Sequence, residues 1–148
     1  MKRYFSPCPR GLEPLLAEDI AVAHGSHVKT VPGGVLFSGN TETCYRVNLE
    51  SRIATRVLWQ LAHGPYKREE DIYQLVRSVN WPKVFAVDRT IRVYVTATRS
   101  PLKSLEFITL RAKDAICDRF RDDCGRRPSV DTREPDVRVH LYLTAEGA

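Results

Sequence analysis

The sequence lacks long hydrophobic runs and complete catalytic motifs. Its 148 residues are 43% hydrophobic, yet each apolar run is only a few residues long, which excludes a transmembrane helix. The N-terminal stretch MKRYFSPCPRGLEP has no apolar segment of the kind that a secretory signal peptide needs. The phosphate-binding motifs G-x-x-x-x-G-K-[ST] and G-x-G-x-x-G and the nucleophile motif G-x-S-x-G are also missing. We therefore expect no catalytic site in this chain.

Cysteine is scarce and scattered. None of the four cysteines forms a C-x-x-C pair, and none has a His or Cys at zinc-finger spacing: Cys8, Cys44, Cys117 and Cys124. Without a signal peptide, the simplest interpretation is a reduced, cytoplasmic protein whose thiols are structural. His24 and His27 lie close together but have no third ligand nearby, so we interpret them as surface histidines. The sequence predicts no metal and no cofactor in this chain.

Acidic residues are nearly absent from one basic stretch. The net charge of the chain is +5, and the stretch from Arg89 to Lys113 holds six basic residues against one acid, Glu106. From Asp114 onward the charges nearly cancel. Such a local excess of positive charge is typical of a nucleic-acid-binding surface. A solvated face that lacks acids is the alternative.

The first part of the chain predicts four strands and two helices in the order βαββαβ, the ferredoxin-like arrangement. In the first helix, Leu12, Leu16 and Ile20 form the expected apolar stripe, with Leu15 beside it. Thr41 is the expected N-cap of the second helix, which has Tyr45 and Leu49 at helical spacing. The predicted strands are Arg3–Ser6, His27–Val31, Val35–Phe37 and Arg56–Ala62, and the first helix is Gly11–His24.

The second part predicts a further α/β unit. Its expected helices are Glu69–Val79 and Leu102–Cys124, with a short helix or turn near Lys83–Phe85, and its expected strands are Thr90–Thr98 and the alternating run that ends at Leu143. The long helix should bury an apolar stripe that comprises Leu105, Ile108, Ala112, Ala115, Ile116 and Phe120. Asp122 and Asp123 are adjacent and should diverge into solvent.

Both strands of this second unit alternate apolar and polar side chains. Their polar faces read Arg92-x-Tyr94 and Arg138-x-His140-x-Tyr142. Arginine binds phosphate with two hydrogen bonds and stacks on bases, and tyrosine and histidine also stack. The pattern therefore predicts a surface for RNA backbone or a single-stranded end. The alternative is that these faces pack on another helix with the tyrosine rings in a core.

Several segments of the sequence match one protein family. Leu110–Asp118 (LRAKDAICD) with Phe120-Arg121, Arg127–Asp131 (RPSVD) and Pro135–Val139 (PDVRV) resemble motifs of THUMP domains in bacterial large-subunit rRNA guanine-N2 methyltransferases. Weaker matches, in the same order, are Arg10–Glu13, Gly33–Phe37 and Asn80-Trp81. The resemblance covers almost the whole chain.

The resemblance implies an α+β layout of two domains. Residues 1–66 would be an N-terminal ferredoxin-like domain, and residues 67–148 a THUMP RNA-binding domain that is truncated at its C-terminal end. In this family a methyltransferase domain with an N-P-P-Y-type motif follows and uses S-adenosylmethionine. Since this chain has no such motif, we expect an N-terminal fragment that docks structured RNA, most simply 23S rRNA, for a catalytic domain in cis.

The candidate RNA-binding residues are basic positions on or near the matched motifs. They are Arg92, Lys103, Arg111, Lys113, Arg126, Arg127 and Arg138. Three acidic residues are expected to be structural, by capping helices, stabilising turns or pairing with these arginines: Asp114, Asp131 and Asp136. The strand that ends at Leu143 is expected to have an unpaired edge. Four alternatives stay open: a tRNA guanine-N2 enzyme, an adenine-specific methylase, a structural or protein-interaction module, and a free-standing enzyme with an unrecognised site.

Overall fold

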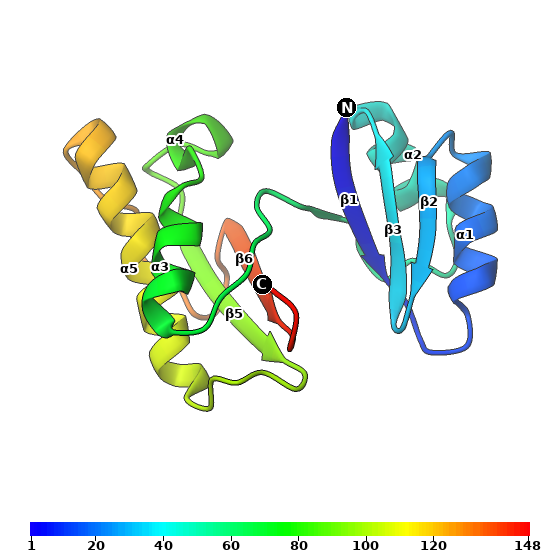
Figure 1. Cartoon of the computed structure of the whole chain (residues 1–148). Helices are drawn as coiled ribbons and strands as arrows, with labels where there is room; N and C mark the ends of the chain where they lie inside the picture. Colours follow the sequence, from blue (N-terminus) through cyan, green and yellow to red (C-terminus); the bar gives the residue numbers. More distant parts are fainter. The chain divides into compact units, whose positions relative to one another are not determined.

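The computed structural model describes residues 1–148, which form two compact units, Met1–Leu61 and Ala62–Ala148 (Figure 1). Each unit has its own sheet, and helices contribute to the core of each. No helix in either unit is both long enough and apolar enough to cross a membrane.

The first unit is a four-stranded antiparallel sheet with two helices. Its spatial strand order is β2-β3-β1-β4, which together with the βαββαβ chain order confirms the ferredoxin-like expectation. The elements are β1 (Lys2–Pro7), α1 (Glu13–Val22), β2 (Ser26–Val31), β3 (Gly34–Gly39), α2 (Thr41–Glu50) and β4 (Leu58–Trp59).

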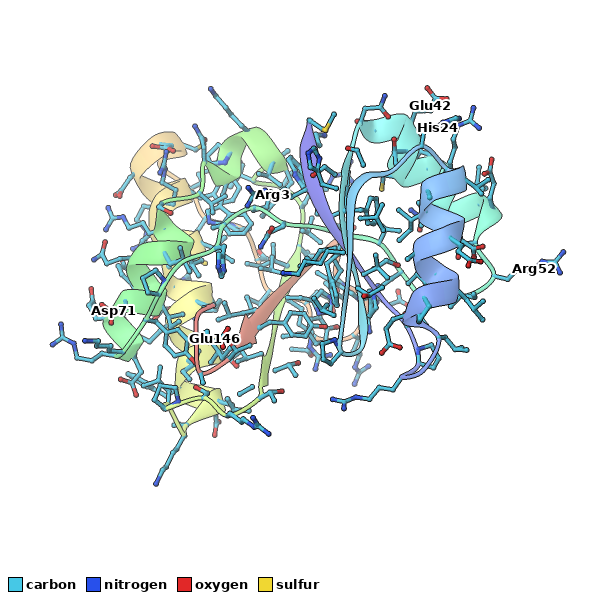
Figure 2. All side chains as sticks on the ribbon, turned by 45° about the vertical axis from the view of Figure 1, so that its right-hand side comes forward. Arg3, His24, Glu42, Arg52, Asp71 and Glu146 are labelled. Carbon is cyan, nitrogen blue, oxygen red and sulfur yellow. The ribbon has the colours of Figure 1, made fainter.

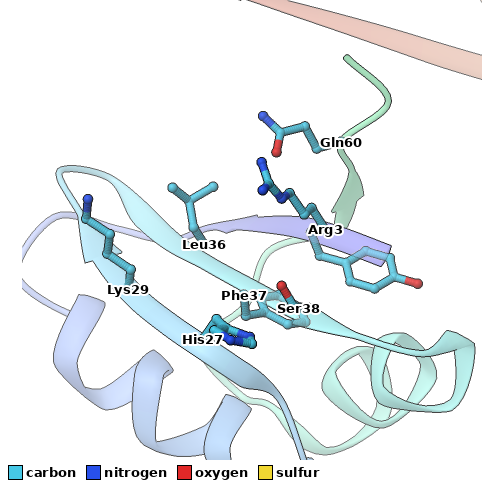
Figure 3. Close-up of a pocket in the computed structure, with 8 residues that line it drawn as sticks. Arg3, His27, Lys29, Leu36, Phe37, Ser38 and Gln60 are labelled. Atoms are coloured by element: carbon cyan, nitrogen blue, oxygen red, sulfur yellow. The ribbon is translucent and has the colours of Figure 1, made fainter. Parts of the chain in front are cut away.

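One face of this sheet forms the core with both helices. Tyr4 pairs with Phe37 across β1 and β3, and both side chains are buried with Leu16 of α1 and Val47 of α2. The next residues along each strand point the other way, as the period of two requires. Figure 3 shows this second face, where Arg3 and other polar side chains project away from the sheet.

The buried stripes of the two helices differ from those expected. Leu12, the N-cap of α1, and Leu15 are exposed, and Leu16 and Ile20 form the buried contact. In α2, Tyr45 and Leu49 are exposed, and the helix buries a different face. The N-cap is Asn40 and not Thr41, since the Asn40 side chain accepts a hydrogen bond from the Thr43 amide at 2.8 Å.

Close packing at the start of α2 explains which of its faces is buried. A Cβ added to Gly39 would lie 2.7 Å from Cβ of Thr43, so the helix approaches β3 through this threonine. Thr43 and Val47, four residues apart, then face the sheet. Charged side chains such as Glu42 and Arg52 project outward on the helical side of this unit (Figure 2).

Strand β4 is only two residues long, shorter than the expected Arg56–Ala62. The preceding residues reach β1 through isolated hydrogen bonds instead of a continuous ladder. The buried Ser6 hydroxyl donates to the Arg56 carbonyl at 2.8 Å, and the Thr55 amide donates to the Pro7 carbonyl at 3.3 Å. Only Tyr4–Trp59 and Phe5–Leu58 are paired.

The second unit has a two-stranded parallel sheet, and its elements agree with the expected order. They are α3 (Glu69–Arg77), α4 (Trp81–Val84), β5 (Ile91–Ala97), α5 (Leu105–Cys124) and β6 (Val137–Leu143). Strand β5 packs against α5, whose buried stripe runs from Ile108 to Phe120, and apolar side chains of both strands are buried, such as Ile91 and Val93 in β5 and Leu141 and Leu143 in β6. Leu105 was expected in this stripe but is 37% exposed, because it is the first residue after the N-cap Ser104.

The two ends of the second unit are joined by backbone hydrogen bonds. The Gly64 amide donates to the Ala148 carbonyl at 3.0 Å, and the Ala148 amide donates back at 2.9 Å. The buried Tyr66 hydroxyl bonds to the Thr144 carbonyl at 2.5 Å and to the Ser100 hydroxyl at 2.8 Å. Strand β6 itself lies at an edge of its sheet.

We predict that Asn40→Ala lowers the free energy of unfolding by about 1 kcal/mol, because the α2 amides lose their side-chain cap. Asn80→Ala is the matched control, since Asn80 is the N-cap of α4 but its side chain makes no capping hydrogen bond. Urea unfolding followed by circular dichroism measures both. Equal losses in the two variants would contradict the assigned cap.

Candidate nucleic-acid interface

The polar face of β5 and β6 places basic and aromatic side chains side by side. Because the strands are parallel and in register, Arg92 lies opposite Arg138 and Tyr94 lies opposite His140. The Tyr94 and His140 rings stack with centroids 5.0 Å apart and planes 14° apart. The Arg92 guanidinium lies 4.6 Å from the centroid of the Tyr94 ring. The result is an arginine–tyrosine–histidine stack that spans both strands.

Two sets of hydrogen bonds hold this polar face near the N-terminal ends of β5 and β6. The Asp136 carboxylate accepts hydrogen bonds from the Thr90 amide at 2.9 Å and from its hydroxyl at 3.2 Å, and the Asp136 amide donates back to that hydroxyl. Arg92 donates to the Thr132 carbonyl at 2.6 Å. Arg138 is exposed and makes no ion pair with a carboxylate. The face therefore has one anchored guanidinium and one that is open to a ligand.

A second basic site lies beside the C-terminal half of α5. Lys113 and Arg127 line a hollow of about 300 Å³ together with Cys117 and residues 128–130. The Lys113 ammonium lies 3.1 Å from the Asp114 carboxylate, and burial raises the pKa of the Cys117 thiol. The thiol is thus neutral, and the charge facing the hollow comes from the two basic side chains.

The loop that presents Arg126 and Arg127 is held by its backbone. Gly125 ends α5 with a φ of 72°, a conformation that favours glycine. Beyond it, the Ile91 amide donates to the Ser129 carbonyl at 2.9 Å, which ties the loop to β5. The Asp131 carboxylate accepts from the amides of Arg133 and Glu134, and these bonds hold the pKa of Asp131 below its usual value. Both arginines are exposed on this loop.

Arg111 occupies a different environment from the other candidates. It forms an ion pair with Glu70 at 2.8 Å and lies 4.1 Å from the centroid of the Tyr73 ring, so it joins α5 to α3. Hydrogen bonds from Gln74 and then from Arg111 lower the pKa of Glu70. Lys103 is exposed in the loop between β5 and α5, whereas Arg92 lies near the start of β5.

The structure therefore divides the predicted residues into groups. Arg92 and Arg138 share the sheet face, Lys113 and Arg127 share the hollow, and Arg126 adjoins the latter pair in sequence. Arg111 and Lys103 belong to neither group.

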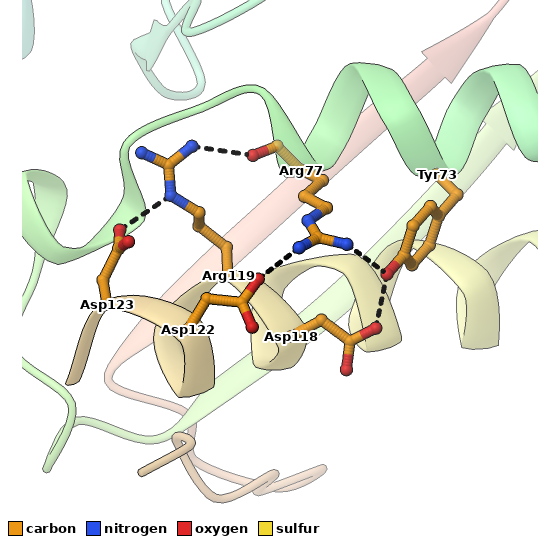
Figure 4. A network of polar contacts seen from close by, with 6 residues as sticks. All are labelled: Tyr73, Arg77, Asp118, Arg119, Asp122 and Asp123. Atoms are coloured by element: carbon orange, nitrogen blue, oxygen red, sulfur yellow. Dashed lines mark hydrogen bonds and ion pairs between the residues drawn. The ribbon is translucent and has the colours of Figure 1, made fainter. Parts of the chain in front are cut away.

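A polar network that the sequence alone did not indicate joins α3 to α5 (Figure 4). The Tyr73 hydroxyl donates to the Asp118 carboxylate at 2.5 Å and accepts from Arg77 at 3.3 Å. The hydrogen bond to Asp118 is the main cause that raises the pKa of Tyr73. These partners are 45 residues apart in sequence, so no local pattern could have revealed the pair.

Asp122 and Asp123 complete the network. They diverge, as expected, but each has an arginine partner and is not simply solvated: Arg77 pairs with Asp122, and Arg119 pairs with Asp123 at 2.7 Å. Arg119 also donates to the Arg77 carbonyl at 3.1 Å. The carboxylates near the C-terminal end of α5 therefore form ion pairs within the fold.

Comparison with known protein families gives two matches. A model described as the THUMP domain matches residues 66–148, and one described as the RlmL ferredoxin-like domain matches residues 3–58. Among curated proteins, the chain is similar to the ribosomal RNA large subunit methyltransferase K/L of Syntrophotalea carbinolica (35% identity over 99% of this chain) and to that of Pseudomonas paraeruginosa (41% over 94%). The chain spans about a fifth of the length of these relatives.

A solved structure shares the fold. It is a protein from Listeria monocytogenes described as a predicted N6-adenine-specific DNA methylase, with a TM-score of 0.84 and 20% identity. The match covers 99% of this chain and 38% of that one. The fold of both units is therefore one that known structures contain.

We predict that Tyr73→Phe lowers the free energy of unfolding by about 1 to 2 kcal/mol at neutral pH, because Asp118 and Arg77 are both deprived of a hydrogen-bond partner. The pKa of Tyr73 is raised above its ordinary value of 10.0, so this stabilisation persists below pH 10 and disappears as the pH rises through the raised pKa. Urea unfolding at several pH values measures the difference.

Tyr45→Phe is the control for this experiment, because Tyr45 is 63% exposed. Its stability should stay within about 0.5 kcal/mol of the parent chain. A Tyr73→Phe variant as stable as this control at neutral pH would show that the network contributes nothing.

Proposed function

The chain belongs to the THUMP domain family, and from that premise we propose that it is the RNA-recognition part of an S-adenosylmethionine-dependent rRNA guanine-N2 methyltransferase. In this proposal residues 1–66 form the ferredoxin-like domain and residues 67–148 form the RNA-binding THUMP domain. The chain docks structured RNA, most simply 23S rRNA in the bacterial cytoplasm, and a methyltransferase domain in cis carries out the reaction. The rRNA methyltransferase relatives support this assignment.

The observation that carries the proposal is the paired surface on β5 and β6. Arg92 and Arg138 are adjacent across the strands, next to the stacked rings of Tyr94 and His140. Two neighbouring guanidinium groups fit the charge and geometry of a phosphate backbone, and a stacked aromatic pair fits the face of a base or ribose. Lys113 and Arg127 would contact a second phosphate at their hollow.

The residues of this chain do not fit a cofactor site. There is no glycine-rich loop after a strand, no N-P-P-Y motif, and no convergent group of three metal ligands in residues 1–148. We therefore assign S-adenosylmethionine and the chemical step to the methyltransferase domain. The role of this chain is to position the RNA, so that the target base can be extruded from its stack into the catalytic domain.

A protein-interaction role is the second candidate. Phe107 and Leu110 of α5 are each about half exposed, at 49% and 50%, and lie three residues apart on one side of the helix. Such side chains fit a protein partner better than a phosphate backbone. Within the RNA proposal, a tRNA guanine-N2 enzyme or an adenine-specific methylase is an alternative parent protein.

We predict that Arg138→Ala and the double variant Lys113→Ala/Arg127→Ala each weaken binding of a structured RNA hairpin about tenfold at low salt, because each removes charge-assisted hydrogen bonds to phosphate. The slope of log K against log salt should fall by about 0.9 for each phosphate that the variant no longer neutralises. A mobility-shift titration of the 148-residue chain at two salt concentrations measures both effects.

Arg111→Gln is the control, since Arg111 is held by Glu70 and Tyr73. It should lower stability and leave RNA affinity within about twofold of the parent chain. Failure of the unaltered chain to bind RNA at low salt, or equal affinity in all variants, would refute the proposed function and favour the protein-interaction role.

A further inference from the structure

The two helices of the first unit carry apolar side chains on their outer sides as well as in the core. Leu15 and Val22 in α1 and Tyr45 and Leu49 in α2 are between 49% and 85% exposed. Of the twelve large apolar side chains that are well exposed in the whole chain, five belong to these two helices or to the α1 N-cap. A helix that is apolar on two sides is normally buried on both. The helices therefore present apolar surface that the fold of this unit does not use.

A glutamate lies in line with the exposed apolar side chains on each helix. Glu18 lies between Leu15 and Val22, at spacings of three and four residues. Glu42 precedes Tyr45 by three residues and projects outward on the helical side of the unit (Figure 2). Side chains three or four residues apart share one side of a helix. Each helix thus presents two exposed apolar groups and one carboxylate in a single outer row.

Both outer rows belong to one surface of the unit. The buried residues Leu16 of α1 and Val47 of α2 join the same core, and the exposed rows lie on the other sides of these helices. The C-cap of α2 also contacts α1, since the Ser51 hydroxyl donates to the Asp19 carboxylate at 2.9 Å. The two rows therefore lie on neighbouring helices, and both point away from the sheet.

The charge of this surface is opposite to that of the rest of the chain. Helices α1 and α2 hold five acidic residues and one basic residue, Arg46, which is a net charge of −4, whereas the whole chain carries +5. Arg46 is already paired with Glu42 and Glu50, and Glu18 forms no ion pair. The surface stays negative even with Arg52, which projects on the same side (Figure 2). It therefore repels RNA phosphates and anionic lipids and attracts a cationic partner.

We propose that the outer face of α1 and α2 is a docking site for a basic amphipathic helix of a protein partner. The apolar side of that helix covers the two exposed rows, and its lysines or arginines pair with Glu18 and Glu42. A helix fits better than a strand, because this face has no open backbone edge with which a strand could pair. A second copy of this chain fits poorly through the same face, since two copies bring acid against acid. The inference goes beyond the proposed RNA surfaces, which lie in the second unit.

The probe is a fluorescent helical peptide of about 18 residues, made of leucine and lysine with the leucines on one side. Anisotropy at two salt concentrations measures its binding to the whole 148-residue chain. We expect Tyr45→Gln/Leu49→Gln to weaken binding about tenfold, because two apolar contacts are lost. Glu18→Gln/Glu42→Gln should weaken binding about threefold and reduce its dependence on salt. Glutamine preserves helix propensity at these exposed positions, and thermal unfolding checks that each variant is folded.

Asp88→Asn/Glu146→Gln is the matched control for charge, because it removes two exposed carboxylates of the second unit that form no ion pair. It should leave peptide affinity within about twofold of the parent chain. A peptide of the same composition in scrambled order has no apolar side and should bind at least about tenfold more weakly. Equal binding of the two peptides, or equal affinity in all variants, would overturn the inference.

Two further measurements separate the docking site from other occupants of this face. Sedimentation of the unaltered chain detects self-association, and a dimer that Tyr45→Gln/Leu49→Gln dissociates would overturn the inference in favour of a second copy. Titrations of the RNA hairpin with the same variants should give affinities within about twofold of the parent chain, because the proposed phosphate contacts lie in the second unit. Loss of hairpin binding in these variants would assign the face to RNA, whereas a chain that binds the peptide but no RNA refutes only the proposed function.

Discussion

The alternation of side chains along paired strands is the constraint that places the sheet-face candidates Arg92 and Arg138 opposite the buried apolar side chains. In the second unit β5 packs against α5, apolar side chains of β5 and β6 such as Ile91 and Leu143 are buried, and the intervening residues must point the opposite way. Parallel pairing in register then places Arg92 beside Arg138. A shift of one residue in either strand would bury an arginine and expose a core valine, so stability and the binding surface depend on the same register.

Ion pairs within the fold determine which basic residues remain available to bind a ligand. Arg77, Arg111 and Arg119 join α3 to α5 through carboxylates, a carbonyl and a tyrosine. Each exposed ion pair contributes little stability by itself. Together they pair three acids of α3 and α5, Glu70, Asp122 and Asp123, within the fold. Arg138 and Arg127 have no carboxylate partner, so their charge is available to a ligand.

Features that repeat with a short period were predicted well from sequence. The strand alternation predicted β5 and β6 correctly, and α5 ends at Cys124, as expected. The resemblance to THUMP domains is confirmed by the family match. Helix faces were harder, because Tyr45 and Leu49 are apolar at the right spacing yet exposed. The close approach at Gly39, a tertiary contact, selects Thr43 and Val47 instead.

Contacts between distant parts of the chain could not be predicted in this way. Arg111 lies in a matched motif and carries the charge expected of an RNA ligand, but Glu70, its partner, is 41 residues away. The side-chain contact just before the short strand β4 is of the same kind, since Ser6 donates to the Arg56 carbonyl from 50 residues away. Single residues can thus look alike in sequence and differ in role according to a partner that only the fold brings near.

Phosphate contacts and stacking contacts contribute differently to the proposed RNA recognition. Phosphate contacts from arginine and lysine supply affinity that depends on salt and hardly on sequence. The stacked Tyr94–His140 pair adds contacts that require exposed bases or riboses, and so favours RNA whose strands are locally unpaired. Neither kind of contact reads one base against another. On the proposed function, this chain would therefore select RNA by shape and by accessible single strands, and the choice of the nucleotide to be methylated would lie with the catalytic domain.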